Sequence, residues 1–127
     1  MEKEFVPYEL AVKLKALGFD EPCLKVFNES KQPRINSESR NWNDNLKNGD
    51  TTSVPTFSQA FRWFREKYHI IGYPIFKGGK TTQTAWYDYV IYSEIEWEVD
   101  NPNQQWKTYE EAELACLEKL IELIENK

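Results

Sequence analysis

The sequence predicts an α+β fold, in which a small antiparallel β-sheet is packed on one face by helices. The main observation is the stretch 84–99, which is rich in the aromatic and β-branched residues that suit a pleated sheet. In its second half Ile95, Trp97 and Val99 alternate with glutamates, as in a strand with one covered face. Three other segments carry apolar residues at helical spacing and can supply that cover. We expect the order α–β–loop–α–β–β–α in a single domain of residues 1–127.

The composition limits the class of protein. The chain of 127 residues suits one domain, and a hydrophobic content of 40% is enough for one core. The formal net charge of −5 makes binding to nucleic acid or to an anionic membrane unlikely, since such binding usually needs a basic surface. No apolar run approaches the roughly 18 residues of a membrane span, and the N-terminus lacks the apolar segment of a signal peptide. The two cysteines are expected to be free thiols in a reducing cytoplasm.

The first 53 residues are expected to hold one helix, one strand and a long polar segment. The helix spans 7–17, begins with a proline and ends at Gly18, which suits a left-handed cap. A short apolar strand follows at 22–27. Residues 28–53 are crowded with Asn, Ser, Asp and charged residues. They form either a mobile polar loop or an irregular hairpin around residues 34–42.

The second half is expected to begin with a helix at 55–68 and a strand at 70–76. Residues 77–80 contain two adjacent glycines and predict a hairpin turn into the stretch 84–99. Sixteen residues are long for one strand, so we expect a bulge or a break near Ser93.

The last helix is expected to run from Thr108 to about Asn126. Thr108 and Glu111 match the capping box, in which each side chain bonds to the other residue's backbone N–H. The apolar stripe of this helix consists of Ala112, Cys116, Leu117, Leu120, Ile121 and Ile124. Glutamates in the first turn also interact favourably with the helix dipole.

The sequence contains no catalytic constellation and no metal-binding cluster. His69 is the only histidine, and both Cys23 and Cys116 fall in apolar segments, where burial makes a thiol inert. The tripeptide 79–81 resembles the end of a phosphate-binding loop, but Pro74 replaces the required glycine and a strand follows where a helix is needed. We therefore expect no enzyme activity, no metal and no cofactor.

Two charged groups of residues are candidate binding surfaces, namely a row of carboxylates and a basic region that consists of Arg62, Arg65, Lys67, Lys77 and Lys80. Glu94, Glu96, Glu98 and Asp100 line one side of the long strand, where they form a solvated face, a partner contact or a divalent-cation site, in decreasing order of frequency. Residues 55–126 have the element order of a double-stranded-RNA-binding domain. That module needs a basic start to its last helix, whereas this one is acidic, so nucleic-acid binding is unlikely.

The candidate binding residues are Arg62, Trp63 and Trp42. On a helical wheel Trp63 lies about 100° from Phe64, at the margin of the apolar stripe. Trp42 lies in the polar segment, so one interior does not accommodate all the aromatic residues. Either these three residues form a partly exposed aromatic and basic patch, of the residue types enriched at interface hot spots, or Trp63 is structural and covered by a neighbouring loop.

Several phrases of the sequence resemble a group of short uncharacterised proteins from prophages and mobile elements of gut bacteria. They are FVPYELA at 5–11, LGFDEPC at 17–23, PTFSQAFRWFREK at 55–67 and TYEEAELACL at 108–117. The resemblance implies a small cytosolic protein in a phage or mobile-element context, without a known activity. The residues favour a non-enzymatic module that binds a protein or a second copy of itself. A binder of a small nucleotide-like ligand is the alternative, and an enzyme of unknown type is the third.

Overall fold

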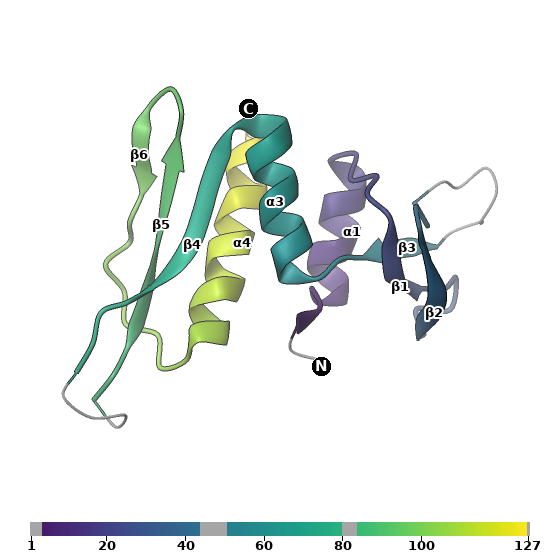
Figure 1. Cartoon of the computed structure of the whole chain (residues 1–127), viewed down its shortest axis with the longest axis horizontal. Helices are drawn as coiled ribbons and strands as arrows, with labels where there is room; N and C mark the ends of the chain where they lie inside the picture. Colours follow the sequence, from purple (N-terminus) through teal and green to yellow (C-terminus); the bar gives the residue numbers. More distant parts are fainter. Residues whose placement is uncertain (1–3, 44–50, 80–83, 127) are drawn as a thin grey trace. The chain divides into compact units, whose positions relative to one another are not determined.

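The structure is a computed structural model, and it describes residues 4–43, 51–79 and 84–126 (Figure 1). The chain divides into two compact units, Met1–Ala60 and Phe61–Lys127. Each unit contains a three-stranded antiparallel sheet within the described residues, and helix α3 (Phe57–Tyr68) spans the boundary. The α+β class is therefore confirmed, with two small sheets where one was expected. The single domain stays a prediction.

The first unit combines helix α1 (Tyr8–Ala16) with a sheet in the order β2–β1–β3. Helix α1 buries Leu10, Ala11 and Leu14, and it packs against β3. After the helix, Gly18 adopts a φ of 96° and the Phe19 N–H donates to the Leu14 carbonyl. This is the predicted left-handed cap, which glycine adopts without steric cost.

The polar segment 28–53 contributes two strands to this sheet. Strand β2 (Pro33–Arg40) pairs with β1 (Cys23–Phe27), and β3 (Thr52–Val54) pairs with the other side of β1. The irregular-hairpin alternative was therefore closer to the structure than the mobile-loop alternative. However, β2 pairs with the preceding strand β1 and not with another part of the segment around residues 34–42. The sequence did not reveal β2 because nearly all of its side chains are exposed, so it lacks the alternation of a half-buried strand. Residues 44–50 lie outside the described residues.

The second unit is a sheet in the order β4–β5–β6 that packs against helix α4 (Tyr109–Glu125), which lies along β4 and β5 (Figure 1). Strand β4 (Ile70–Phe76) is antiparallel to β5 (Tyr87–Ser93). Helix and sheet approach each other closely at Gly72. A Cβ atom there would lie 2.9 Å from Cys116 Sγ and 3.2 Å from Leu120 Cδ1. Glycine at this position therefore allows α4 to pack directly on the sheet.

The long predicted strand is divided, as expected, near Ser93. Strand β5 ends at Ser93, the chain turns through 94–96, and β6 (Trp97–Asp100) returns antiparallel to β5. The expected apolar face of this stretch was wrong, because Ile95 is 94% exposed and Trp97 is 77% exposed. The alternation was counted across a turn, where the chain reverses and the two-residue period of a strand does not apply.

Two helices begin with side-chain caps. The Glu111 N–H donates to the Thr108 hydroxyl oxygen at 3.1 Å, which confirms the predicted start of α4, although the Glu111 carboxylate returns no bond within the described residues. A complete capping box begins α3 instead. There the Gln59 N–H donates to the Thr56 hydroxyl oxygen at 3.1 Å, and the Thr56 N–H donates to Gln59 Oε1 at 3.0 Å.

Replacing Thr108 with alanine is expected to lower the free energy of unfolding by about 1 kcal/mol, because the Glu111 N–H loses its acceptor at the helix start. Thr108→Ser is the matched control, since serine keeps the hydroxyl and should keep most of the stability. Chemical denaturation of both variants measures the difference. Equal stability of Thr108→Ala and the parent would show that this cap contributes nothing.

Candidate functional site

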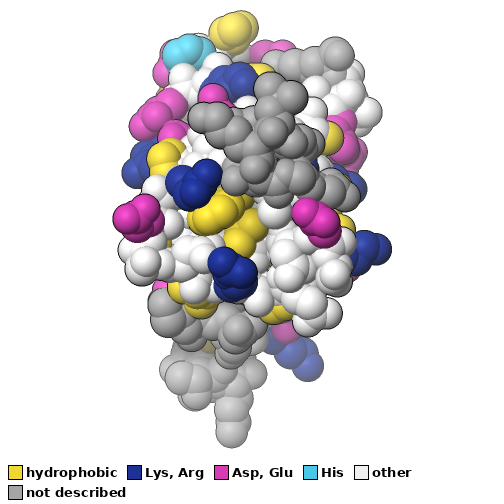
Figure 2. Space-filling view, turned by 90° about the vertical axis from the view of Figure 1, so that its right-hand side faces the viewer, with side chains coloured by type: hydrophobic (Ala, Val, Ile, Leu, Met, Phe, Trp, Pro, Cys, Tyr) yellow, Lys and Arg dark blue, Asp and Glu magenta, His cyan; other side chains and the backbone are white. Residues whose placement is uncertain are grey.

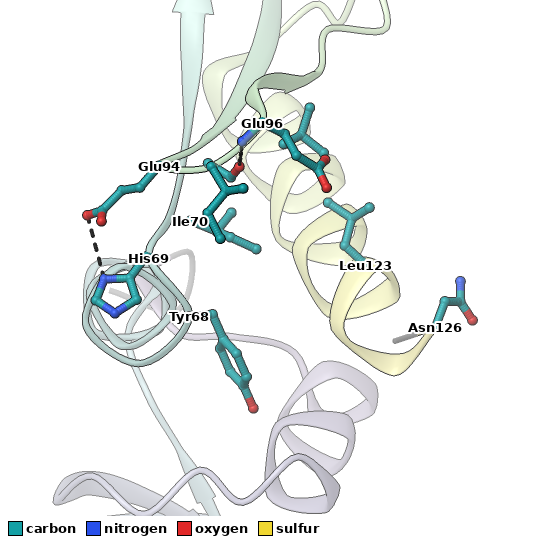
Figure 3. A pocket seen from close by; sticks show the side chains of 10 residues that line it. Tyr68, His69, Ile70, Glu94, Glu96, Leu123 and Asn126 are labelled. Carbon is teal, nitrogen blue, oxygen red and sulfur yellow. Dashed lines mark hydrogen bonds and ion pairs between the residues drawn. The ribbon is translucent and has the colours of Figure 1, made fainter.

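A pocket lies beside the β5–β6 turn, within the second unit (Figure 3). Its volume is about 370 Å³. The end of α3, the start of β4, the turn, β6 and the end of α4 all contribute to its wall. We call it the turn pocket, and its lining residues are Tyr68, His69, Ile70, Ser93, Glu94, Ile95, Glu96, Val99, Leu123 and Asn126.

The backbone of the turn is held in place by two hydrogen bonds. The Glu96 N–H donates to the Ser93 hydroxyl oxygen at 2.7 Å, and the Glu94 N–H donates to the His69 carbonyl at 3.2 Å. A serine hydroxyl that bonds to a backbone N–H a few residues ahead is a common way to stabilise a turn. These bonds join the turn to the end of α3, and they position two carboxylates at the pocket.

The pocket has an apolar wall and an acidic rim. Ile70, Val99 and Leu123 provide apolar surface, whereas Glu94 and Glu96 are exposed carboxylates. In Figure 3 the Glu94 side chain turns toward His69, with 3.5 Å between its Oε1 and the imidazole Nδ1, while the Glu96 side chain extends toward α4.

Helix α4 adds to the negative character of the rim. The end of α4 contributes Asn126 to the wall, and its last turn contains no basic residue. The carbonyl groups at a helix C-terminus carry a negative partial charge. The rim therefore favours cations over anions.

Trp97 lies next to the turn in an unusual backbone conformation. Its φ is 69°, in the left-handed region, and it pairs with Ser93 across a turn of three residues. Hairpin loops of this length commonly end in a left-handed residue, which is usually glycine. A tryptophan there costs about 1–2 kcal/mol of backbone strain relative to an ordinary conformation. Strain of this kind is concentrated at functional sites.

The Trp97 ring continues into a row of aromatic side chains. Its ring centroid is 5.7 Å from that of Tyr92, which is 6.4 Å from that of Tyr73. Because Gly72 faces α4 and side chains alternate along a strand, Tyr73 points away from the helix. The aromatic row of Tyr73, Tyr92 and Trp97 therefore lies on the sheet face opposite α4.

Trp63 belongs to the interior, which corrects the interpretation that it lies in an exposed patch. It is only 3% exposed, and its ring makes edge contacts with Phe64 at 5.2 Å and Tyr68 at 5.5 Å between centroids. The Lys67 ammonium lies 5.0 Å from the centroid of the indole ring. Trp63 is therefore buried although it lies at the margin of the apolar stripe, because the buried side of α3 is wider than that stripe.

Arg62 and Trp42 lie in different units of the chain. Arg62 is exposed on α3, with its Nε 3.9 Å from the Glu66 carboxylate. Trp42 is half-buried in the first unit, where its indole N–H donates to the Cys23 carbonyl at 2.9 Å. The Arg40 guanidinium lies 4.5 Å from the centroid of the Trp42 ring. Trp42 therefore helps to hold the segment that follows β2.

Both cysteines are buried as free thiols, as expected, and burial makes them unreactive. Both are fully buried, and burial raises the pKa of the Cys23 thiol to about 12. Burial, followed by the nearby Asp100 carboxylate, also raises the pKa of the Cys116 thiol. Both thiols are therefore protonated at neutral pH. Within the part of the chain that the structure describes, no group of three or more His, Cys, Asp or Glu side chains is placed to hold a metal ion.

The face of the molecule seen in Figure 2 has no comparable candidate binding site among its described residues. On the face seen in Figure 2, positive and negative side chains are interspersed around small hydrophobic areas, as on an ordinary solvated surface. Among the described residues no helix has the length and apolar character needed to cross a membrane.

Comparisons with protein-family models, curated proteins and solved structures found no match to this chain.

Proposed function

We propose that this chain is a non-enzymatic module that binds a protein, either a partner or a second copy of itself, through the surface around Trp97. The observation that supports this proposal is a tryptophan that is 77% exposed in a backbone conformation that favours glycine. Neither property benefits folding, since an exposed indole buries little area and the conformation is strained. Both are accounted for if Trp97 packs into another protein, because tryptophan is enriched among the residues that dominate interface energies.

The neighbouring residues support the same proposal. Ile95, at the tip of the turn, is 94% exposed, and the aromatic row extends from Trp97 across the sheet. The nucleotide-like ligand has less support, because the acidic rim of the turn pocket repels phosphate groups. The cytosolic, phage or mobile-element setting is part of this proposal and rests on the resemblance of the sequence phrases.

A photo-crosslinking experiment tests the proposal. Ile95 is replaced by benzoylphenylalanine, and light is applied to the purified chain and to the cells from which the gene comes. We expect a covalent adduct, with a second copy in the first case or with a partner protein in the second. The same probe at Glu118, an exposed residue of α4, is the control.

Trp97→Gly, combined with the Ile95 probe, separates binding from folding. The melting temperature should stay the same or rise, because glycine adopts a positive φ without strain, whereas the adduct should disappear. Adducts that persist in this variant, or that form equally from the Glu118 probe, would overturn the proposal.

A further inference from the structure

The turn pocket is large enough for one long side chain, and part of its wall is apolar. Its volume of about 370 Å³ is at the lower end of the range for ligand pockets. Ile70, Val99 and Leu123 come from β4, β6 and α4, and they offer apolar surface to an aliphatic chain. An alkyl stem placed among them would be removed from water.

The rim selects the charge of the group that the stem carries. Glu94 and Glu96 stand at the opening on the turn, and none of the described residues that line the pocket is a lysine or an arginine. The C-terminal end of α4 adds a negative partial charge on the side of Asn126. A group that is apolar along its length and positively charged at its end matches both parts of the pocket, as the side chains of lysine and arginine do.

The surroundings indicate that this group belongs to a protein rather than to a free amine. Ile95 lines the pocket and is 94% exposed, whereas Trp97 belongs to the aromatic row on the other face of the sheet and is 77% exposed. A small amine would leave both residues in water, whereas a polypeptide segment that wraps around the tip of the turn would cover Ile95 together with the pocket and would reach Trp97.

We infer that the turn pocket receives a lysine or arginine side chain from a basic segment of the partner protein, while the partner's neighbouring residues cover Trp97. This inference rests on the proposed protein-binding function. The pocket then provides the charge selectivity of the contact, and Trp97 provides much of its buried area.

The test uses a defined probe, the capped peptide acetyl-Gly-Leu-Lys-Leu-Gly-amide, in titrations followed by backbone amide NMR shifts. We expect saturable shifts at His69, at residues 93–96 and at Leu123. A peptide with norleucine in place of lysine keeps the stem without the charge, and it should bind clearly more weakly. Inorganic phosphate should give no shifts at these positions.

Glu96→Gln and Glu94→Gln should each weaken binding of the lysine peptide by about twofold to fivefold, as removal of one partner of an exposed ion pair does. Raised ionic strength should weaken peptide binding by the parent, and it should affect a variant that carries both Glu94→Gln and Glu96→Gln less. Glu118→Gln, which changes the same charge on an exposed part of α4 outside the pocket, is the matched control and should leave binding unchanged.

The outcomes separate the two proposals. If the norleucine peptide binds as tightly as the lysine peptide, or if shifts appear at Trp97 and Tyr92 but not at the pocket residues, the pocket inference is overturned and the protein-binding proposal stands. If the Ile95 probe yields no adduct, the protein-binding proposal fails even when the peptide occupies the pocket. Absence of shifts anywhere in the second unit overturns the pocket inference.

Discussion

Replacing Trp63 with alanine is expected to lower the free energy of unfolding by about 3–5 kcal/mol, as truncation of a large buried aromatic residue does. Trp63 is only 3% exposed, and its ring contacts Phe64 and Tyr68. The substitution would leave a cavity beside both rings, which a helix backbone closes only in part. Equilibrium denaturation in urea, with the slope of the transition compared between variants, measures the loss.

Trp97→Ala is the matched control for this experiment. It removes the same atoms from a residue that is 77% exposed, so its effect on stability should be within about 0.5 kcal/mol. If Trp63→Ala were as stable as Trp97→Ala, the interior position of Trp63 would be wrong. The exposed-patch interpretation of Trp63 and Arg62 would then return.

Gly72→Ala should be the second most destabilising change, with an expected loss of about 1–3 kcal/mol from overpacking. The new methyl group would lie 2.9 Å from the Cys116 sulfur and 3.2 Å from Leu120 Cδ1, and both distances are shorter than ordinary van der Waals contact. The helix would have to move away from the sheet, or both side chains would have to change rotamer. Thermal and chemical denaturation both measure this loss.

A double-mutant cycle with Cys116→Ala tests the stated cause. Removal of Sγ makes room for the new methyl group, so the cost of Gly72→Ala should be smaller by at least about 0.5 kcal/mol in the Cys116→Ala background. Additive effects of the two substitutions would mean that α4 and β4 do not meet at this position as described.

The helices illustrate what local patterns predict well. The stripe of α1, its glycine cap and the Thr108 cap of α4 each depend on residues a few positions apart, and each is present in the structure. The complete capping box of Thr56 and Gln59 was also readable from the sequence, because it matches the pattern of a threonine followed three residues later by glutamine. The burial of Trp63, which lies at the margin of the apolar stripe, depends instead on what covers α3.

The candidate site was not predicted, because its parts come from distant positions in the chain. Ser93 carried the one local signal, since a hydroxyl that bonds to the Glu96 N–H favours a turn there. That turn exposes Ile95 and Trp97, which the alternation had assigned to a covered face. In the sequence β5 and β6 thus looked like one continuous strand with one covered face, although the chain reverses direction between them.

The sequence by itself determined the α+β class, the three described helices, the buried cysteines and the break near Ser93, because helical spacing, capping residues and strand composition act over short distances. Only the tertiary structure decided that β2 pairs with β1, that the strands form two sheets, and that Trp63 is buried while Trp97 is exposed. The physical reason is that pairing and burial depend on neighbours supplied by other parts of the chain. The turn pocket, whose wall combines α3, β4, β6 and α4, exists only once those parts have met.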